Sequence, residues 1–350
     1  MGQKEAAMIP SFESDYNNGA HPKVLRHLIE TNDSQSASYG YDTWSEQARQ
    51  KIRMACQTPN ADIFFLVGGT QANATVIDAL LPSYAAVIAT QTAHISVHES
   101  GAIEANGHKV ITLPAHQGRM VATELDDYLR RFFTDPTWEH MAVPGMVYIT
   151  FPTELGTLYK ATDIEAIHQV CLQHELPLFV DGARLGYGLA SPEADIDLPW
   201  LAHYCEAFYI GGTKVGALCG EAVVFPNGAP RGFFTMVKRH GALLAKSRLA
   251  GVQFDALFTD GLYLDIAHHA IDMAQRMRRL FANAGLPMKD SPTNQQFVTL
   301  THDQREHLMS HVLFETWEPI DNDHTLCRFV TSWATTDDDL RQLETALKQL

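Results

Sequence analysis

The 350-residue sequence contains no run of about 18 apolar residues, so it predicts no membrane-spanning helix. Residues 1–10 lack the apolar core of a secretory signal peptide, and export is not expected. The five cysteines form no C-x-x-C pair and the 17 histidines form no H-E-x-x-H motif, which argues against a disulfide framework and a metal site. Basic residues are scarce: 26 Lys and Arg against 41 Asp and Glu give a formal charge of −15, which disfavours nucleic-acid binding. We expect a cytoplasmic protein without a membrane or nucleic-acid partner.

Apolar strands and amphipathic helices alternate between about residue 45 and residue 225. The predicted strands cover residues 61–67, 85–89, 109–113, 144–150, 177–180, 207–210 and 222–225. The predicted helices between them cover residues 44–55, 71–81, 94–106, 123–133 and 163–174. Strands separated by helices predict an α/β fold with a mostly parallel sheet and helices on both faces. Ligands of such sheets bind beyond the carboxyl ends of the strands.

The pattern changes after about residue 255. A long helix is predicted over residues 261–281 and a final helix over 336–350, with strands over 296–301 and 328–333. Because 350 residues exceed a typical single core, two packed regions are expected. We predict a large domain over residues 15–255, and a smaller α+β domain over residues 256–350 together with residues 1–14.

Two predicted strands end in an acid and a lysine. Asp181 follows the apolar run 176–180, and Lys214 follows the segment Gly211–Thr213, 33 residues after Asp181. Chemistry with pyridoxal 5′-phosphate (PLP) needs this pair, because a lysine amine binds the aldehyde covalently and a carboxylate keeps the pyridine nitrogen protonated. Burial beside a cationic group is expected to lower the pKa of that lysine, which must attack as a neutral amine. Taken alone, Lys214 also fits a solvated loop lysine, and Asp181 a turn aspartate.

Further segments supply groups that PLP chemistry uses. Gly68–Asn73 joins a strand to a helix, where open N–H groups and a threonine hydroxyl suit a phosphate. His94 could stack over a pyridine ring and transfer protons, or it could be a hydrogen-bonded core histidine. Arg184 and Arg328 suit the bidentate binding of a carboxylate, or internal salt bridges.

In this order the residues resemble the threonine aldolase and aromatic amino acid β-eliminating lyase family, PLP enzymes of fold type I. The matching segments, which span nearly the whole chain, are Glu13–Asp15, Tyr39–Asp42, Gly68–Asn73, Ala93–His94, Val180–Arg184, Lys214 and the late strand with Arg328. The sequence departs from the family pattern at Thr150–Glu154, which replaces Glu-Asn-Thr-His, and at residues 213–220 and 241–248. These departures fall in segments expected to line the substrate side.

The resemblance implies how the cofactor would be held. Lys214 would bind PLP covalently, Asp181 would pair with the pyridine nitrogen, and His94 would stack on the ring. The residues expected at the phosphate are Gly69, Thr70 and Gln71.

The resemblance also implies residues on the substrate side. Ser14, Arg184 and Arg328 would bind the substrate carboxylate or neighbouring cofactor oxygens. His140 would be a second active-site histidine near the substrate hydroxyl. Arg248 would reach the cofactor phosphate of a neighbouring subunit, because the family builds its sites at dimer interfaces. A homodimer or homotetramer with shared active sites is therefore expected.

The leading hypothesis is retro-aldol cleavage of L-threonine, allo-threonine or a related β-hydroxy-α-amino acid to glycine and an aldehyde. Arg328 and Ser14 would hold the small-molecule substrate by its carboxylate, and His94 or His140 would take the hydroxyl proton. A β-eliminating lyase, transaminase or racemase would use the same lysine and aspartate, so these activities stay open. A PLP-fold binding or regulatory module is the non-enzymatic alternative, and Lys214 together with the carboxylate-binding residues speaks against it.

Overall fold

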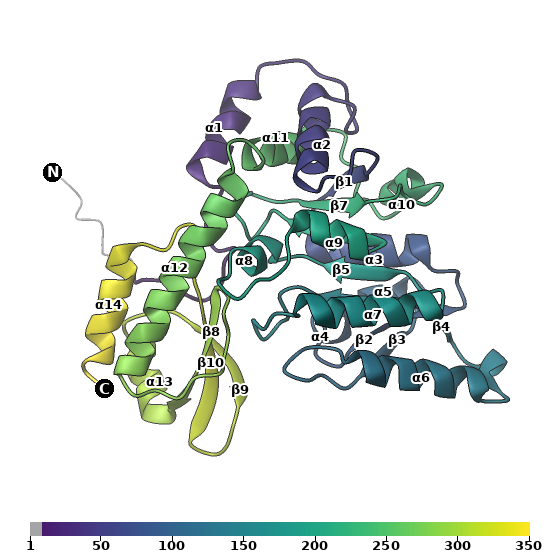
Figure 1. The fold of residues 1–350 in the computed structure, drawn as a ribbon. Helices are drawn as coiled ribbons and strands as arrows, with labels where there is room; N and C mark the ends of the chain where they lie inside the picture. Colours follow the sequence, from purple (N-terminus) through teal and green to yellow (C-terminus); the bar gives the residue numbers. More distant parts are fainter. Residues whose placement is uncertain (1–8) are drawn as a thin grey trace.

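The computed structural model describes residues 9–350, and a seven-stranded sheet lies at the centre of its larger part (Figure 1). The strands are arranged in the order β1-β7-β6-β5-β4-β2-β3. Their bounds are Asp62–Leu66 (β1), Ala85–Thr90 (β2), Val110–Leu113 (β3), Val143–Thr150 (β4), Leu178–Asp181 (β5), Ala207–Gly211 (β6) and Glu221–Phe225 (β7). Strand β7 runs antiparallel to both neighbours, and the other pairs are parallel. The predicted α/β fold with a mostly parallel sheet is confirmed.

Helices cover both faces of this sheet because its strands are apolar on both sides. Every residue of β2, β5, β6 and β7 is buried. One face packs against α2 (Thr43–Ala55), α6 (Ala122–Thr134), α7 (Ala161–Gln173), α8 (Leu185–Leu189), α9 (Leu198–Tyr204) and α11 (Arg248–Leu257). The other face packs against α3 (Gly69–Leu80), α4 (His94–Val97), α5 (Ala102–Ala105) and α10 (Phe233–Arg239). The site described below therefore rests on a sheet that is enclosed on both sides.

The helix predicted over residues 94–106 is two short helices, α4 and α5. The chain between them turns through Ser100 and Gly101, whose φ angles are 52° and 73°. A left-handed backbone cannot continue a right-handed helix, and glycine adopts it without steric cost. The break leaves His94 at the start of α4 and buries Glu99 between the two helices.

The C-terminal part contains a three-stranded antiparallel sheet in the order β8-β10-β9. Its strands are Gln295–Thr301 (β8), Glu315–Pro319 (β9) and His324–Val330 (β10), and its helices are α12 (Leu262–Asn283), α13 (His302–Met309) and α14 (Asp337–Leu347). Apolar side chains of α12, α13 and α14 form one core with β8 and β10. The two predicted strands are present, although β10 ends at Val330 rather than at residue 333. Strand β9 was not predicted, because its residues are half-buried or exposed and do not alternate between apolar and polar.

The N-terminal segment joins the small sheet. The N–H of Phe12 donates to the carbonyl of Leu313, and the carbonyl of Phe12 accepts from the N–H of Val330. This pairing places Phe12 between Leu313 and β10. The domain boundary itself stays a prediction, and residues 1–8 lie outside the described part of the chain.

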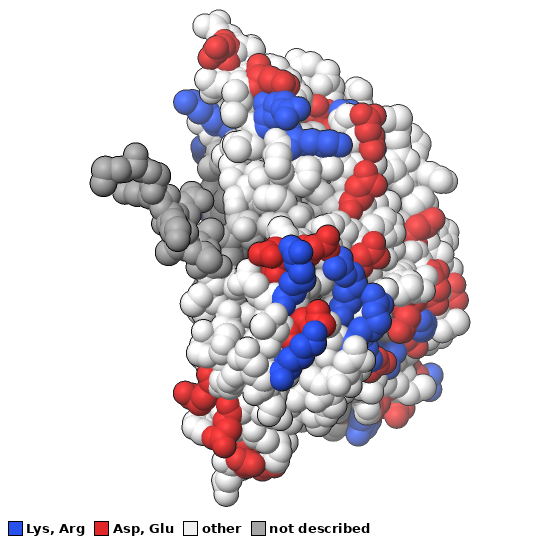
Figure 2. Space-filling model, turned by 90° about the vertical axis from the view of Figure 1, so that its left-hand side faces the viewer, with Lys and Arg blue, Asp and Glu red and all other residues white. Residues whose placement is uncertain are grey.

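Helix α1 (Pro22–Thr31) packs beside α11, which in turn packs against α2, so the three form a group at the top of Figure 1. On the face drawn in Figure 2, acidic and basic side chains are interspersed. Two basic residues of α12 form ion pairs: Arg276 with Asp337 at 2.5 Å, and Arg278 with Asp290 at 2.8 Å. Within residues 9–350, no helix has the length and apolar character needed to cross a bilayer.

Candidate active site

The segments that follow β1, β2, β4, β5 and β6 meet beyond the carboxyl ends of these strands. They line a cavity of about 110 Å³, and six predicted residues face it: Gly69, Thr70, His94, Asp181, Arg184 and Lys214. An adjoining cavity of about 260 Å³ is bounded by the small sheet through Glu315, Trp317 and Arg328. The two cavities share His94, Glu154, Arg184 and Lys214. The structure therefore brings the predicted lysine and aspartate to one space.

Asp181 is held by four hydrogen bonds from four segments. Its Oδ1 accepts from the Tyr209 hydroxyl at 2.5 Å and from the N–H of Ala183 at 2.9 Å. Its Oδ2 accepts from the Tyr148 hydroxyl at 2.5 Å and from Asn73 Nδ2 at 2.9 Å. Such a set of donors fixes the carboxylate in one orientation and stabilises its charged form.

The close approach of β5 and β6 makes this arrangement possible. A Cβ atom on Gly182 would lie 1.9 Å from the carbonyl oxygen of Tyr209, so only glycine fits directly after Asp181. Burial by itself raises the pKa of Asp181, but the charge of His94 and the hydrogen bonds to the carboxylate outweigh it, and the net pKa is lowered. Asp181 therefore remains ionised at neutral pH, as a partner of a pyridinium nitrogen must.

Lys214 lies in a loop that a buried carboxylate holds in place. Glu221, at the start of β7, accepts from the N–H of Gly212 at 3.0 Å and from the hydroxyl of Thr213 at 2.9 Å. The Tyr187 hydroxyl donates to the carbonyl of Lys214 at 2.5 Å. The backbone on both sides of the lysine is thus fixed, and the amine is positioned at the cavity.

The Lys214 amine is half-buried and lies 6.0 Å from the centre of the Tyr16 ring. Burial lowers its pKa, the Arg184 guanidinium lowers it further, and nearby carboxylates oppose the shift without reversing it. The direction is the one predicted, and it increases the fraction of neutral, nucleophilic amine. Burial raises the pKa of Glu221, because its charged form loses hydration.

Glu221→Ala should lower the free energy of unfolding by about 1–3 kcal/mol, because the hydroxyl of Thr213 would lose its acceptor and the N–H of Gly212 would keep only the carbonyl of Gly220. Urea unfolding of the variant measures this loss. Glu139→Ala is the matched control, since Glu139 is exposed, and it should change stability by less than about 0.5 kcal/mol. Equal midpoints for Glu221→Ala and the wild type would show that the carboxylate does not hold the Lys214 loop.

The first turn of α3 offers backbone donors to the same cavity. Gly68 precedes the helix without a side-chain cap, and the N–H groups of residues 69–71 have no acceptor among the described residues. A helix N-terminus with open N–H groups suits a phosphate. The Gln71 side chain is otherwise engaged, because its Oε1 accepts from the N–H of Val67 and its Nε2 donates to the carbonyl of His240, each at 3.2 Å. Only the backbone of Gln71 is therefore available to a ligand.

His94 is held from two sides. Its backbone N–H donates to Glu154 Oε1 at 2.8 Å, and its Nδ1 lies 2.7 Å from Glu99 Oε1. The same Glu99 oxygen accepts at 2.8 Å from Asn73 Nδ2, which also donates to Asp181. A continuous set of polar contacts thus joins His94 to Asp181 and fixes the plane of the imidazole at the cavity wall.

Arg328 faces the second cavity from β10. Its Nη2 forms an ion pair with Glu315, its Nη1 donates to Gln295 Oε1 at 3.0 Å, and its guanidinium lies 4.7 Å from the centre of the Trp317 ring. Its Nε is buried and has no partner among the described residues. A guanidinium with an unpaired buried donor at a cavity suits the carboxylate of a small ligand.

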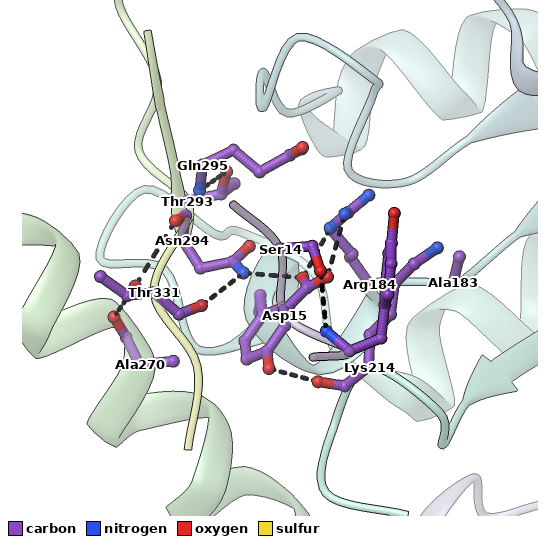
Figure 3. A network of polar contacts seen from close by, with 12 residues as sticks. Ser14, Asp15, Ala183, Arg184, Lys214, Ala270, Thr293, Asn294, Gln295 and Thr331 are labelled. Carbon is purple, nitrogen blue, oxygen red and sulfur yellow. Dashed lines mark hydrogen bonds and ion pairs between the residues drawn. The ribbon is translucent and has the colours of Figure 1, made fainter. Parts of the chain in front are cut away.

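Figure 3 shows Asp15 between the Lys214 loop and the small-sheet region. Arg184 holds this carboxylate through Nε at 2.7 Å and Nη2 at 3.0 Å, and Asn294 Nδ2 donates to it at 2.9 Å. Burial raises the pKa of Asp15, but the charge and hydrogen bonds of Arg184 outweigh it and lower the net pKa. Arg184 is thus an internal salt-bridge partner that also lines both cavities, and Asp15 links the site to the C-terminal part.

Two predicted residues on the substrate side do not line either cavity. Ser14 donates through its hydroxyl to Asn17 Oδ1 at 2.7 Å, and the neighbouring Tyr16 lines the second cavity instead. His140 ends the 3₁₀ helix η1 (Trp138–His140), which precedes β4. The eight residues of β4 separate the two ends by roughly 26 Å, and the site lies beyond the far end. The structure does not bring His140 to the site, and we correct that prediction.

Arg248 is also absent from the two cavities. It donates to the carbonyls of Thr31 at 2.5 Å and Ser34 at 2.7 Å, and its guanidinium lies 4.3 Å from the centre of the Trp44 ring. In its own chain it satisfies carbonyls at the end of α1. Its contact with the cofactor of a neighbouring subunit stays a prediction.

Sequence reasoning missed several residues that support the site. An acid at the start of the apolar run 221–225 and an acid closing the segment 150–154 are signals that could have identified Glu221 and Glu154. Asn73 and Glu99 carry no such signal, because polar residues on helices are common. Their contacts depend on the packing of α3 against the chain break between α4 and α5.

The mostly parallel sheet, the small antiparallel sheet and the lysine–aspartate pair at the strand ends define the class of fold type I PLP-dependent enzymes. The family model described as "Beta-eliminating lyase" matches residues 12–308, and the chain belongs to this family. It is thus a lyase of the threonine aldolase and β-eliminating lyase group.

Known proteins extend this likeness over most of the chain. The low specificity L-threonine aldolase of Pseudomonas sp. (strain NCIMB 10558) is 31% identical over 277 residues, which cover 78% of each chain. The solved threonine aldolase of Leishmania major is 36% identical with a TM-score of 0.92, covering 97% of this chain and 99% of that chain. A PLP-bound protein of Clostridium difficile 630, described as an aminotransferase, is 12% identical with a TM-score of 0.72, covering 97% and 92%, and shares the fold alone.

Proposed function

We propose that the protein is a PLP-dependent aldolase that cleaves L-threonine, allo-threonine or a related β-hydroxy-α-amino acid to glycine and an aldehyde. The observation that carries this proposal is the placement of Asp181 and Lys214 at one cavity beside the open N–H groups of α3. The three features match the three ends of PLP: an amine for the aldehyde, a carboxylate for the pyridine nitrogen and backbone donors for the phosphate. When bound, PLP accepts the electron pair that a broken bond leaves on the substrate α-carbon.

The substrate and the cofactor are bound by different residues of the two cavities. Arg328 binds the substrate carboxylate, which replaces Glu315 as its partner and orients the bond to be broken. Asp181 keeps the pyridine nitrogen protonated, and His94 covers the ring. Trp317 and the small sheet limit access of water to the reacting atoms.

Product analysis tests this function against its alternatives. The protein supplied with PLP should release acetaldehyde from L-threonine or allo-threonine and leave glycine. Release of pyruvate from serine without any aldehyde from β-hydroxy amino acids would favour a β-eliminating lyase, and transfer of the amino group to a keto acid would favour a transaminase. Borohydride reduction followed by mass spectrometry should locate the cofactor on Lys214.

Arg328→Lys should raise the KM for threonine by roughly 10- to 100-fold, since one charge-assisted hydrogen bond is worth about 1.5–3 kcal/mol. Steady-state kinetics of aldehyde release measure the change. Arg341→Lys is the control, because Arg341 is a surface residue of α14 that pairs with Asp338. An unchanged KM in Arg328→Lys would place the substrate carboxylate elsewhere.

The homodimer or homotetramer with shared active sites and the cytoplasmic location stay predictions from the sequence. Sedimentation of the protein with and without PLP would measure the oligomeric state.

A further inference from the structure

We propose that Glu154 accepts the proton of the substrate β-hydroxyl, a role that rests on the proposed aldol cleavage. Glu154 lies in the loop after β4, in the segment Thr150–Glu154 that departs from the family pattern. It lines the cavity that contains Asp181, and it also lines the cavity that contains Arg328. A substrate whose carboxylate is at Arg328 and whose α-carbon is near Lys214 must cross the boundary between these cavities.

Few side chains at that boundary can accept the hydroxyl proton of a substrate. The side chains common to both cavities are His94, Glu154, Arg184 and Lys214. A guanidinium cannot accept a proton, and the lysine amine is used to hold the cofactor. The hydroxyl proton of a bound substrate is therefore left to Glu154 or His94.

The hydrogen bonds favour Glu154. Its Oε1 is occupied, because it accepts from the N–H of His94 at 2.8 Å and from the Thr150 hydroxyl at 2.7 Å. Its Oε2 forms no hydrogen bond with any other residue within residues 9–350, and Glu154 lines both cavities. The Nδ1 atom of His94 is held by Glu99, which fixes the plane of the ring and leaves Nε2 as the competing acceptor that the experiment below distinguishes from Glu154. The carboxylate thus presents a fixed, free oxygen where the hydroxyl must pass.

The surroundings of Glu154 suit a proton acceptor that works near neutral pH. Burial raises the pKa of Glu154 to about 6, and Asp181 adds to the rise, while the hydroxyl of Thr150 opposes it. A base is most effective when its pKa is close to the working pH. The surrounding ionisable groups lie on α4, on β4 and β5, in the segment before α7 and in the loops after β5 and β6: His94, Tyr148, Asp181, Tyr159, Arg184 and Lys214.

The proton and the electrons are accounted for in this step. The hydroxyl gives its proton to Glu154 Oε2, the oxygen forms the carbonyl of the aldehyde, and the bond between Cα and Cβ breaks. The electron pair stays with Cα, which takes up one proton to complete glycine. The two products contain all the atoms of the substrate, and no oxidant or reductant is needed.

Glu154→Gln separates proton transfer from positioning. The carbonyl oxygen of the glutamine can still accept from His94 and Thr150, so the loop and the histidine keep their places, but the amide cannot accept a proton. For the holoenzyme, kcat/KM of the wild type should rise with pH through about 6, because only ionised Glu154 is active. In Glu154→Gln this rise should disappear, and kcat/KM at neutral pH should fall by about 10²–10⁴-fold. Glu154→Asp should recover part of the rate, and Glu139→Gln, on the surface, should match the wild type.

A readout without turnover completes the test. Carboxyl-labelled glutamate in the cofactor-free protein should show by ¹³C NMR one carboxyl that titrates near pH 6 and is missing in Glu154→Gln. Wild-type protein that releases no aldehyde from any β-hydroxy amino acid would overturn the proposed function, and the role of Glu154 with it. The role of Glu154 alone would be overturned if the wild type cleaves threonine, kcat/KM of Glu154→Gln is within about threefold of the wild-type value, and kcat/KM of the variant still rises with pH through about 6.

Discussion

Lys214→Ala is expected to lower kcat/KM for aldehyde release by more than about 10³-fold, the order of loss that follows removal of a nucleophile. The lysine lines both cavities, and its lowered pKa increases the fraction of neutral, nucleophilic amine. No neighbouring side chain replaces it, because Arg184 is held by Asp15 and carries a guanidinium. The visible absorbance of the lysine-bound cofactor should vanish together with the activity.

Lys348→Ala is the control for this experiment, since Lys348 is exposed at the end of α14 and pairs with Glu344. Its activity should equal that of the wild type. Thermal unfolding of Lys214→Ala should show a folded protein, because the loop is held by contacts of the lysine backbone and of Glu221. A folded Lys214→Ala variant with full turnover would refute the proposed chemistry.

Asp181→Asn is expected to reduce kcat by about 10²–10³-fold, because a neutral amide cannot keep the pyridine nitrogen protonated and the developing negative charge loses its stabilisation. The variant should also be less stable by about 1–3 kcal/mol, since its new N–H₂ group would face a buried donor, Ala183 N–H or Asn73 Nδ2. The stability that ionised Asp181 contributes is present at neutral pH and disappears as pH falls through its lowered pKa.

Tyr209→Phe provides the matched control for Asp181→Asn. It removes one hydrogen bond from the same carboxylate but leaves the negative charge in place. Its kcat should fall by less than about tenfold, the effect of one hydrogen bond of about 1 kcal/mol. Equal losses in the two variants would mean that the orientation of Asp181, rather than its charge, supports turnover.

The residues that sequence reasoning placed in the site share one property. Asp181, Lys214, His94 and the Gly68–Asn73 segment each follow an apolar strand or begin the next helix, so a local pattern was enough to direct them to the carboxyl edge of the sheet. His140 shows the limit of this reasoning. Only the family resemblance implied His140, and because this residue precedes β4 it lies at the end of the strand opposite the site.

The sequence by itself determined the sheet, the edge at which the chemistry lies and the lysine–aspartate pair. Alternating apolar segments, and the residues that end them, encode these features over short stretches of chain. Only the tertiary structure decided which groups share a cavity. Asp15 and Asn294 meet across the chain, and Asp181 receives donors from four separate segments. Those contacts depend on how α3, β4, β6 and the small sheet pack around one buried carboxylate, and no local pattern records that packing.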